Sequence, residues 1–241
     1  MDSVDLWIKH AILEYNISCN PGSRTTPMNL EGVIKFHVEH ETNVGCVEPD
    51  IAELTKWRKE LRAAGLVGQD IARYGGLGFG NLSKRMADGT FLITASQTGH
   101  LETLTPDHFT RIVHSDPDRN RVRCRGINPP SSETMTHLAV YYSIPDVQFV
   151  YHVHCPEIWT SRTGLGLPIT HPAIECGTVE MFYEVRRLLK FHKNRQRGIL
   201  AMGGHIDGLL SWAETADQAG FLLLSLLSQS MQSQSHATAV S

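Results

Sequence analysis

Two histidines stand two positions apart in an apolar run of the sequence, Val147–Cys155. The run is rich in β-branched and aromatic residues, which is typical of a buried strand. Successive side chains of a strand point to opposite faces, so His152 and His154 share one face. Neutral imidazoles held side by side on a rigid strand are suited to binding a divalent metal ion. Two buried histidines that only form hydrogen bonds are the alternative, because an H-x-H pair alone is a weak motif.

A third metal ligand is available near residue 205. His205 follows a strand-like run, Gly198–Met202, and lies among glycines 51 residues after His154. Two histidines from one strand and a third side chain from a distant loop form a three-ligand site that keeps one coordination position open for catalysis. Asp207, two residues further on, is able to supply the third ligand in place of His205, or to orient that histidine from outside the ligand set. The residues leave both alternatives open.

Glu133 is the candidate acid/base. It follows Ser131 and Ser132 and opens a helical pattern, where the helix dipole stabilises a carboxylate. The serine hydroxyls and the first N–H groups of the helix are suited to holding a phosphate or another anion. A solvated carboxylate at a helix start is the alternative for Glu133. His137, one turn later, is interpreted as structural rather than as a metal ligand.

Two loops offer further contacts for an anion. The segment Tyr74–Ser83 is dense in glycine and contains Asn81, and the segment Ala95–Gly99 follows a strand-like run and contains Thr98. Glycines allow the backbone to approach a ligand closely, and the Asn and Thr side chains bind its oxygen atoms. Tight turns are the alternative. The glycine spacing matches neither the dinucleotide-binding nor the P-loop pattern.

Helical and strand-like segments alternate along the chain without an internal repeat or a dividing linker. Strands are expected at 31–39, 91–94, 122–125, 147–155 and 198–202. Helices are expected at 5–16, at 50–64 before Gly65, from Thr105-Pro106, from residue 134, from Gly177-Thr178 and after a cap at Thr215 and Gln218. The body of the last helix, 221–227, is apolar on almost every side and must be buried in the core or in a subunit interface.

The composition is that of an ordinary globular protein, with 41% hydrophobic and 20% charged residues. A net charge of -3 gives no reason to expect a nucleic acid partner. The five cysteines are scattered, with no C-x-x-C, which indicates reduced thiols. We see no signal peptide, and the longest apolar block falls far short of the roughly 20 residues that span a bilayer. We therefore expect a cytoplasmic protein with no membrane partner.

Five motifs, taken in order, resemble the class II aldolase/adducin family. They are Gly80-Asn81-Leu82-Ser83, Ile93-Thr94 leading to Thr98-Gly99, Pro130-Ser131-Ser132-Glu133 with His137, His152-Val153-His154, and Gly204-His205 before Gly208. Each motif is weak alone, and five in the family's order are specific. The resemblance covers roughly residues 50–228. Residues 1–49 are then an N-terminal extension with a helix and a strand, and residues 229–241, rich in Ser and Gln, are expected to be disordered.

The resemblance implies an α/β fold with three layers, α/β/α, around a central and mainly antiparallel sheet. It also implies a homotetramer with sites near subunit interfaces. In the family's sugar-phosphate enzymes three histidines hold zinc, matched here by His152, His154 and His205; Mn2+, Fe2+ or Co2+ are alternatives. The catalytic carboxylate matches Glu133. The positions that hold the substrate phosphate match Asn81, Thr98, Gly99, Ser131 and Ser132. Such a metal stabilises an enediolate, and Glu133 would take or return the proton.

Two departures from the family's pattern leave questions open. Many members have a metal histidine immediately before the glycine of the last motif, where this sequence has Asp207. The family's aldolases also use a tyrosine as an acid, for which Tyr183 is a candidate here. The leading hypothesis is a metal-dependent lyase acting on a sugar phosphate or a related hydroxy-ketone through an enediolate, with aldol cleavage favoured. The second is an epimerase or dehydratase with the same site, and the third is a non-catalytic, adducin-like interaction module.

Overall fold

The computed structural model describes residues 32–42, 48–192 and 196–239. Its centre is an eight-stranded sheet with the order β1-β7-β6-β5-β4-β8-β10-β9. In that order the strands are His37–Glu41, Arg121–Arg125, Phe109–Asp116, Phe91–Thr94, Asn81–Arg85, Phe149–His154, Gly208–Ala213 and Gly198–Ala201. The β1–β7 pair is parallel and the other pairs are antiparallel. A separate ribbon joins β2 (Gly68–Gln69) to β3 (Gly78–Phe79).

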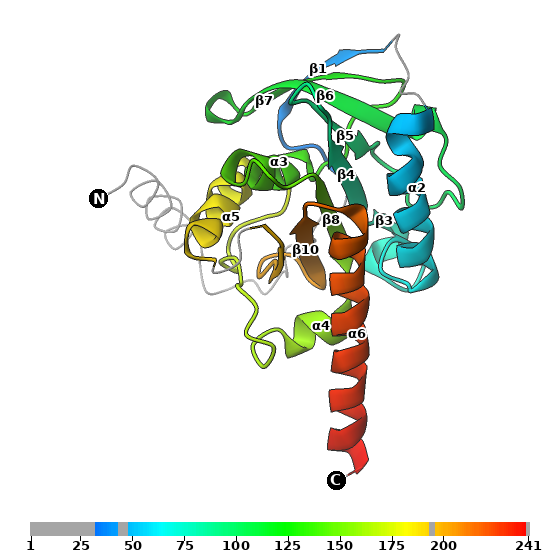
Figure 1. Ribbon diagram of the computed structural model, residues 1–241, viewed down its shortest axis with the longest axis vertical. Coiled ribbons are helices and arrows are strands. Elements are labelled where there is room, and N and C mark those ends of the chain that lie inside the picture. Colours follow the sequence, from blue (N-terminus) through cyan, green and yellow to red (C-terminus); the bar gives the residue numbers. More distant parts are fainter. Residues whose placement is uncertain (1–31, 43–47, 193–195, 240–241) are drawn as a thin grey trace, which may run out of the picture.

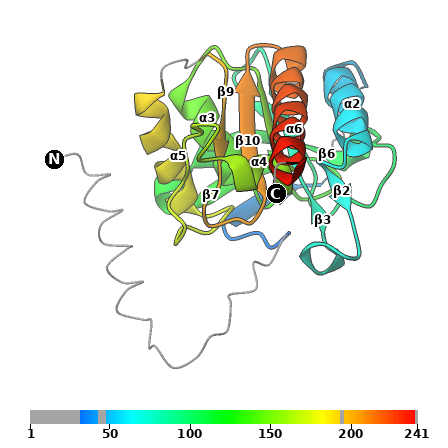
Figure 2. The ribbon, with the colours of Figure 1, turned by 90° about the horizontal axis from the view of Figure 1, so that it is seen from below.

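Helices cover both faces of this sheet (Figure 2). On one face α3 (Thr134–Ser143) and α5 (Val179–Phe191) pack against a first apolar core that includes Val150 and Leu210. On the other face α2 (Glu48–Ala63), α4 (Pro156–Ser161) and α6 (Ala216–Ala239) pack against a second core around Tyr151 and Val153. Alternate residues of β8 therefore enter different cores, as the two-residue period of a strand requires. The predicted α/β fold with a mainly antiparallel sheet is confirmed.

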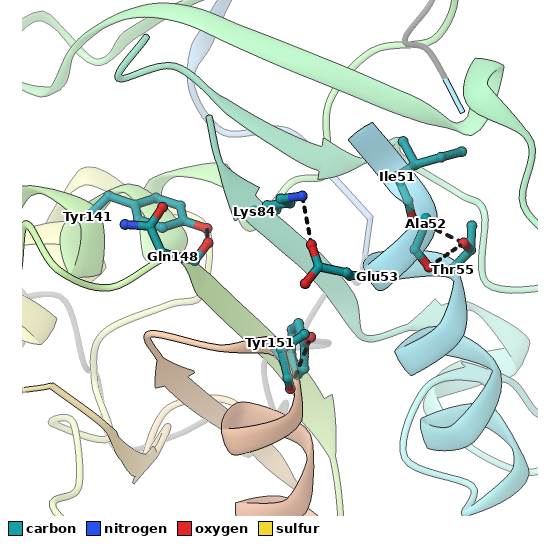
Figure 3. A network of polar contacts seen from close by, with 9 residues as sticks. Ile51, Ala52, Glu53, Thr55, Lys84, Tyr141, Gln148 and Tyr151 are labelled. Atoms are coloured by element: carbon teal, nitrogen blue, oxygen red, sulfur yellow. Dashed lines mark hydrogen bonds and ion pairs between the residues drawn. The ribbon is translucent and has the colours of Figure 1, made fainter. Parts of the chain in front are cut away.

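Polar contacts fix α2 on the sheet. Glu53 of α2 forms an ion pair of 2.7 Å with Lys84 of β4, close to the ring of Tyr151 in Figure 3. The indole Nε1 of Trp57 donates to the Asp217 carboxylate at the start of α6, over 2.8 Å. These contacts hold α2 beside both β4 and α6. Figure 1 shows that α6 then continues away from the sheet and beyond α4.

Most of the expected elements are present. The strands expected at 91–94, 122–125, 147–155 and 198–202 appear as β5, β7, β8 and β9, and the 31–39 segment contributes to β1, which begins only at His37. The helix expected from Thr105-Pro106 is a single turn, Pro106–His108, after which the chain enters β6. The cap predicted for the last helix is confirmed, since Gln218 N donates to Thr215 Oγ1 and Thr215 N to Gln218 Oε1.

The disorder expected for residues 229–241 is wrong for most of that segment, because α6 is helical through Ala239. Gln is a good helix former and Ser is only mildly unfavourable, so polar composition alone did not preclude a helix that extends from a buried start. The helix expected at 5–16 lies outside the described residues, and the domain boundaries drawn from the sequence stay a prediction. No helix in the described part of the chain is long and apolar enough to cross a membrane.

Candidate metal centre

The last two histidines of β8 lie in the middle of the sheet. β8 pairs with β4 on one side and β10 on the other, so that Asn81 and Leu210 flank His152 and Gly208 is opposite His154. All six residues of β8 are buried. His152 and His154 alternate with Tyr151 and Val153, so their side chains lie on the face that α3 and α5 cover. The strand thus places two imidazoles inside the protein rather than at its surface.

His205 reaches the same point from the turn between β9 and β10. Its N–H donates to Met202 O, and its own carbonyl accepts from Gly208 N. A Cβ atom at Gly208 would lie 2.5 Å from the His205 ring, which is closer than real Cβ contacts. Glycine at this position is therefore what allows the His205 ring to lie over the start of β10, beside His154.

The three imidazoles converge through their Nε2 atoms. These atoms are 3.2 Å apart between His152 and His154, 3.0 Å between His154 and His205, and 3.3 Å between His152 and His205. Zinc with nitrogen ligands at 2.0–2.1 Å in tetrahedral geometry requires separations of about 3.3–3.4 Å. The triangle therefore needs only a slight expansion to fit such an ion.

The hydrogen bond of His152 also favours metal binding. Its Nδ1 lies 3.0 Å from Leu209 O, and since a carbonyl can only accept, Nδ1 carries the proton. The Nε2 lone pair of His152 then points into the triangle, as a ligand nitrogen must. The exposed fractions of the three side chains are 0%, 0% and 1%, so the donors are fully desolvated. The donor set fits a divalent ion.

Glu133 lies next to this triangle. It occupies the N-cap of α3 rather than its first turn, and it is buried. Its Oε2 accepts a 2.6 Å hydrogen bond from Thr136 Oγ1. One ligand atom each of Glu133, Cys176 and His205 lie within 4.8 Å of one another. The carboxylate is thus held beside a group that also belongs to the histidine cluster.

Asp207, the alternative third ligand, is placed elsewhere by the structure. Its backbone has φ +64°, a left-handed conformation, and its Oδ2 accepts a 2.7 Å hydrogen bond from the hydroxyl of Tyr74. The clusters of potential ligand atoms among the described residues contain His205 and not Asp207. The turn therefore directs His205 inward and Asp207 toward the β2–β3 segment.

Tyr74 connects that segment to the histidines. Its ring packs edge-on against His154 with centroids 4.5 Å apart, and its hydroxyl accepts a 2.7 Å bond from Arg73 while donating to Asp207. Burial, opposed by the bond from Arg73, raises the pKa of the Tyr74 phenol, so it stays protonated at neutral pH. Tyr183, the tyrosine suggested from the sequence, instead contacts Asp118 beside α5.

The residues predicted to bind an anion fall into two groups. Asn81 is next to His152 across the sheet, and Leu82 N and Ser131 N donate to the Oγ1 and the carbonyl of Thr94. This places Asn81 near the Ser131-Ser132 turn, where both serines are buried and Ser131 Oγ accepts from Glu133 N. The Asn81 Oδ1 atom is buried and has no described partner. These residues gather around the histidine cluster.

Thr98 and Gly99 form the second group, which is tied to α2. Arg58 Nη2 donates to Thr98 O over 2.9 Å, and Arg62 Nη1 donates to Gly99 O over 2.8 Å. The Thr98 hydroxyl donates to Ala95 O within its own loop. The described contacts of this loop are with α2 and within the loop itself, whereas Asn81 lies beside His152.

His137 is held in a structural role. Its Nδ1 lies 2.7 Å from Ser83 Oγ, which in turn lies 2.8 Å from the Tyr141 hydroxyl. Burial, and then the proximity of His152, hold the pKa of His137 well below its usual range, so its ring is neutral. His137 lies outside the clusters of potential ligand atoms found among the described residues. These contacts agree with the interpretation made from the sequence.

Sequence reasoning missed Tyr74, Cys176 and the arginines of α2. Tyr74 begins the glycine-dense segment, and a large aromatic residue followed by four nearby glycines is the signal that could have identified it. Cys176 is one of five scattered cysteines and precedes Gly177, at which a Cβ would lie 2.3 Å from Ser132 O. That close approach brings Cys176 next to Glu133. Only a tertiary contact carries this information.

Comparison with known proteins gives a family match that covers the site. Residues 71–232 match the family described as "Class II Aldolase and Adducin N-terminal domain". The matched range contains every residue discussed above for the metal, acid/base and anion roles, but not Arg58 and Arg62.

Solved structures share the fold. L-fuculose-1-phosphate aldolase from Thermus thermophilus superposes with a TM-score of 0.56 at 20% identity, covering 78% of this chain and 93% of that one. Another L-fuculose 1-phosphate aldolase gives a TM-score of 0.60 at 19% identity, covering 81% and 89%. At these identities the likeness shows the fold alone.

One relative is similar in sequence over a shorter stretch. Methylthioribulose-1-phosphate dehydratase from Gluconacetobacter diazotrophicus is 40% identical over 75 residues, which are 31% of this chain and 34% of that enzyme. The aligned region therefore spans about a third of the relative's length.

Proposed function

This chain belongs to the class II aldolase and adducin family, and from that premise we propose that it is a metal-dependent lyase acting on a phosphorylated hydroxy-ketone. The observation that carries the proposal is the convergence of three imidazole Nε2 atoms within 3.0–3.3 Å of one another, beside a buried carboxylate. Three ring nitrogens at this separation are readily held together by a shared metal ion when their lone pairs point inward, as that of His152 does. A scaffold protein has no use for such a costly arrangement.

The ligands of the proposed ion are His152, His154 and His205. A divalent ion bound there, most simply Zn2+, acts as a Lewis acid toward a carbonyl and a neighbouring hydroxyl oxygen and stabilises the negative charge that develops on them. His152 is oriented for this role by Leu209 O, and His154 by the ring of Tyr74. The choice of zinc over Mn2+, Fe2+ or Co2+ rests on the all-nitrogen donor set.

Glu133 is the proposed proton carrier. In aldol cleavage its carboxylate takes the proton of the substrate hydroxyl as the adjacent C–C bond breaks, and the electron pair of that bond passes to the carbon next to the ketone. The proton is then returned to that carbon. The bond from Thr136 Oγ1 to Oε2 fixes the carboxylate in position. Burial of Glu133 and the histidines keeps competing water away from the carbanionic species.

Asn81, Ser131 and Ser132 are proposed to hold the substrate phosphate near the cluster. Their polar atoms are buried, and the Asn81 amide has an oxygen with no described partner. Because amide oxygen and nitrogen are interchangeable by rotation, the side chain is able to present donors to a phosphate. From the family resemblance Thr98 and Gly99 are proposed to contact the same phosphate from the separate loop that Arg58 and Arg62 hold.

Dehydration is the second candidate reaction. The sequence similarity to a dehydratase at 40% identity favours it over epimerisation. The same carboxylate would then remove a proton next to the ketone. The freed electron pair would form the C=C bond as the hydroxyl group on the following carbon leaves, and that hydroxyl would take up the proton from Glu133 to form water. An adducin-like interaction module is the remaining alternative if the protein binds no metal.

The homotetramer implied by the resemblance stays a prediction. The exposed side chains of Phe221 and Met231 on α6 are available for such an interface.

Product analysis tests the proposal and separates the reactions. Zinc-loaded protein is incubated with a panel of ketose 1-phosphates in D2O, and the reaction is followed by 1H and 31P NMR. We expect deuterium to enter the substrate or product at the carbon next to the ketone. Aldol cleavage releases dihydroxyacetone phosphate and an aldehyde, whereas dehydration gives one product lighter by one water. Neither exchange nor product formation with any member of the panel, by protein with stoichiometric metal, would contradict the lyase assignment.

The Tyr74 ring gives a further prediction. Tyr74→Ala removes the packing against His154 and is expected to weaken zinc binding about tenfold, as groups that orient ligands from outside do. Tyr74→Phe keeps the ring and loses only the hydroxyl bonds with Arg73 and Asp207, so its effect on zinc affinity is expected to be smaller. Competition with a chromophoric chelator measures both affinities. Tyr183→Phe, which removes the contact with Asp118 instead, is the control and should bind zinc as the wild type does.

A further inference from the structure

A cleft of about 690 Å³ lies next to the histidine cluster, between the end of α2 and the β2–β3 segment. Its lining includes Arg62, Arg73, His100 and Gln69. We propose that this cleft is an oxyanion-binding subsite for a second anionic group of the substrate, a phosphate or a carboxylate, at the end remote from the metal. The proposal deepens the proposed function and rests on it for the identity of the substrate, but the binding of an anion is testable without catalysis.

The two guanidinium groups of the cleft lack an acidic partner among the described residues. Arg62 Nη1 donates to Gly99 O, and Arg73 donates to Gly65 O and to the Tyr74 hydroxyl. Neither forms an ion pair with any carboxylate in the part of the chain that the structure describes. Each guanidinium has five N–H donors, so donors remain for an anion in the cleft.

A third arginine, Arg58, adds positive charge close to Arg62. Arg58 is 4% exposed, and its guanidinium is used on the carbonyls of Thr98, Gly99 and Glu102. Burial, together with the charge of Arg62, lowers the pKa of Arg58 to about 10. A buried cation next to another cation is costly unless a negative charge lies close by. Asp70 is the acid in the cleft lining, and its Oδ1 already accepts from Ala72 N.

Gly65 and Gly68 contribute backbone without side chains to part of the cleft wall. A Cβ atom at Gly99 would lie 2.4 Å from Gly68 O, and one at Gly68 would lie 3.1 Å from Arg62 Nη1. No side chain therefore stands between an entering anion and Arg62 at this point. His100 and Gln69 also line the cleft. Guanidinium groups beside such polar side chains suit an oxyanion.

One layer of side chains separates the cleft from the histidines. Phe79 lines the cleft, its ring centroid lies 5.5 Å from that of His154, and Arg73 Cζ lies 4.6 Å from the Phe79 centroid. The Arg73 guanidinium is thus within about 10 Å of the His154 ring. A sugar phosphate is able to bridge a separation of this size, so one molecule can occupy both places.

Titration calorimetry with inorganic phosphate tests the proposal. Metal-free protein is used so that phosphate cannot bind to zinc, and zinc-loaded protein is measured alongside. Arg62→Gln and Arg73→Gln are each expected to weaken phosphate binding at least about tenfold, the effect of losing a charged hydrogen bond. Arg62→Lys and Arg73→Lys keep the charge and are expected to retain most of the affinity, which separates loss of charge from loss of fold.

Two controls define the outcome. Arg119→Gln changes an exposed arginine that pairs with Asp116 outside the cleft and should leave phosphate binding unchanged. Ser131→Ala changes the side near the histidines and should leave binding at the cleft intact. Wild-type affinity in both glutamine variants, or loss of all binding in Ser131→Ala alone, would overturn the cleft assignment. A protein that binds phosphate through these arginines but has no metal and no turnover would overturn the proposed function and leave the subsite standing.

Discussion

His152→Ala is expected to abolish stoichiometric metal binding while the protein remains folded. The variant leaves two of three ligands, and losing a ligand costs more affinity than the roughly 10–100-fold caused by losing a group that only orients one. The imidazole is buried, so its removal leaves a small polar cavity. We expect a cost of about 1–3 kcal/mol and a melting temperature lower by several degrees. Elemental analysis of protein purified without added metal measures the effect, with circular dichroism to check the fold.

Matched variants make this result specific. His114→Ala removes an exposed histidine on β6 and should leave the metal content unchanged. His205→Ala is expected to behave like His152→Ala, whereas Asp207→Ala should keep most of the metal, because its carboxylate bonds with Tyr74. The reverse order for these last two would make Asp207 the third ligand. Unchanged metal content in His152→Ala would remove the basis for the whole ligand assignment.

Glu133→Gln is expected to keep the metal and lose turnover. Glutamine has the same shape, and its amide oxygen still accepts the hydrogen bond from Thr136 Oγ1, so the site should stay assembled. The amide cannot take a proton at neutral pH, and loss of a general base typically lowers kcat by about 10²–10⁴-fold. The measurement is kcat on the substrate found by NMR, together with deuterium exchange next to the ketone.

A second buried carboxylate is the control. Glu184 of α5 is buried like Glu133, but it bonds with Arg187 and with the backbone N–H of His171. Glu184→Gln is expected to lower stability and leave kcat close to that of the wild type. Full activity in Glu133→Gln would exclude Glu133 as the proton carrier. An equal loss of activity in both variants would attribute the effect to packing.

Local patterns were sufficient wherever one element decides the outcome. The two-residue period of a strand places His152 and His154 on one face, and the cap residues Thr215 and Gln218 begin α6 as expected. β10 was missed because it is buried on both faces, so its apolar residues do not alternate with polar ones. β6 was missed because Thr105 and Pro106 do start a helical turn, but it lasts only three residues.

The sequence by itself determined which groups are candidates for the chemistry: two histidines on one face of a strand, a carboxylate at a helix start and a candidate third ligand near residue 205. Only the tertiary structure brought the His205 ring to His152 and His154 and directed Asp207 toward Tyr74, because the direction of each side chain depends on the turn before β10. It also brought Cys176 to Glu133 and left Arg58, Arg62 and Arg73 without described acids around a cleft. Contacts between residues far apart in the chain follow from packing and register, which no local pattern encodes.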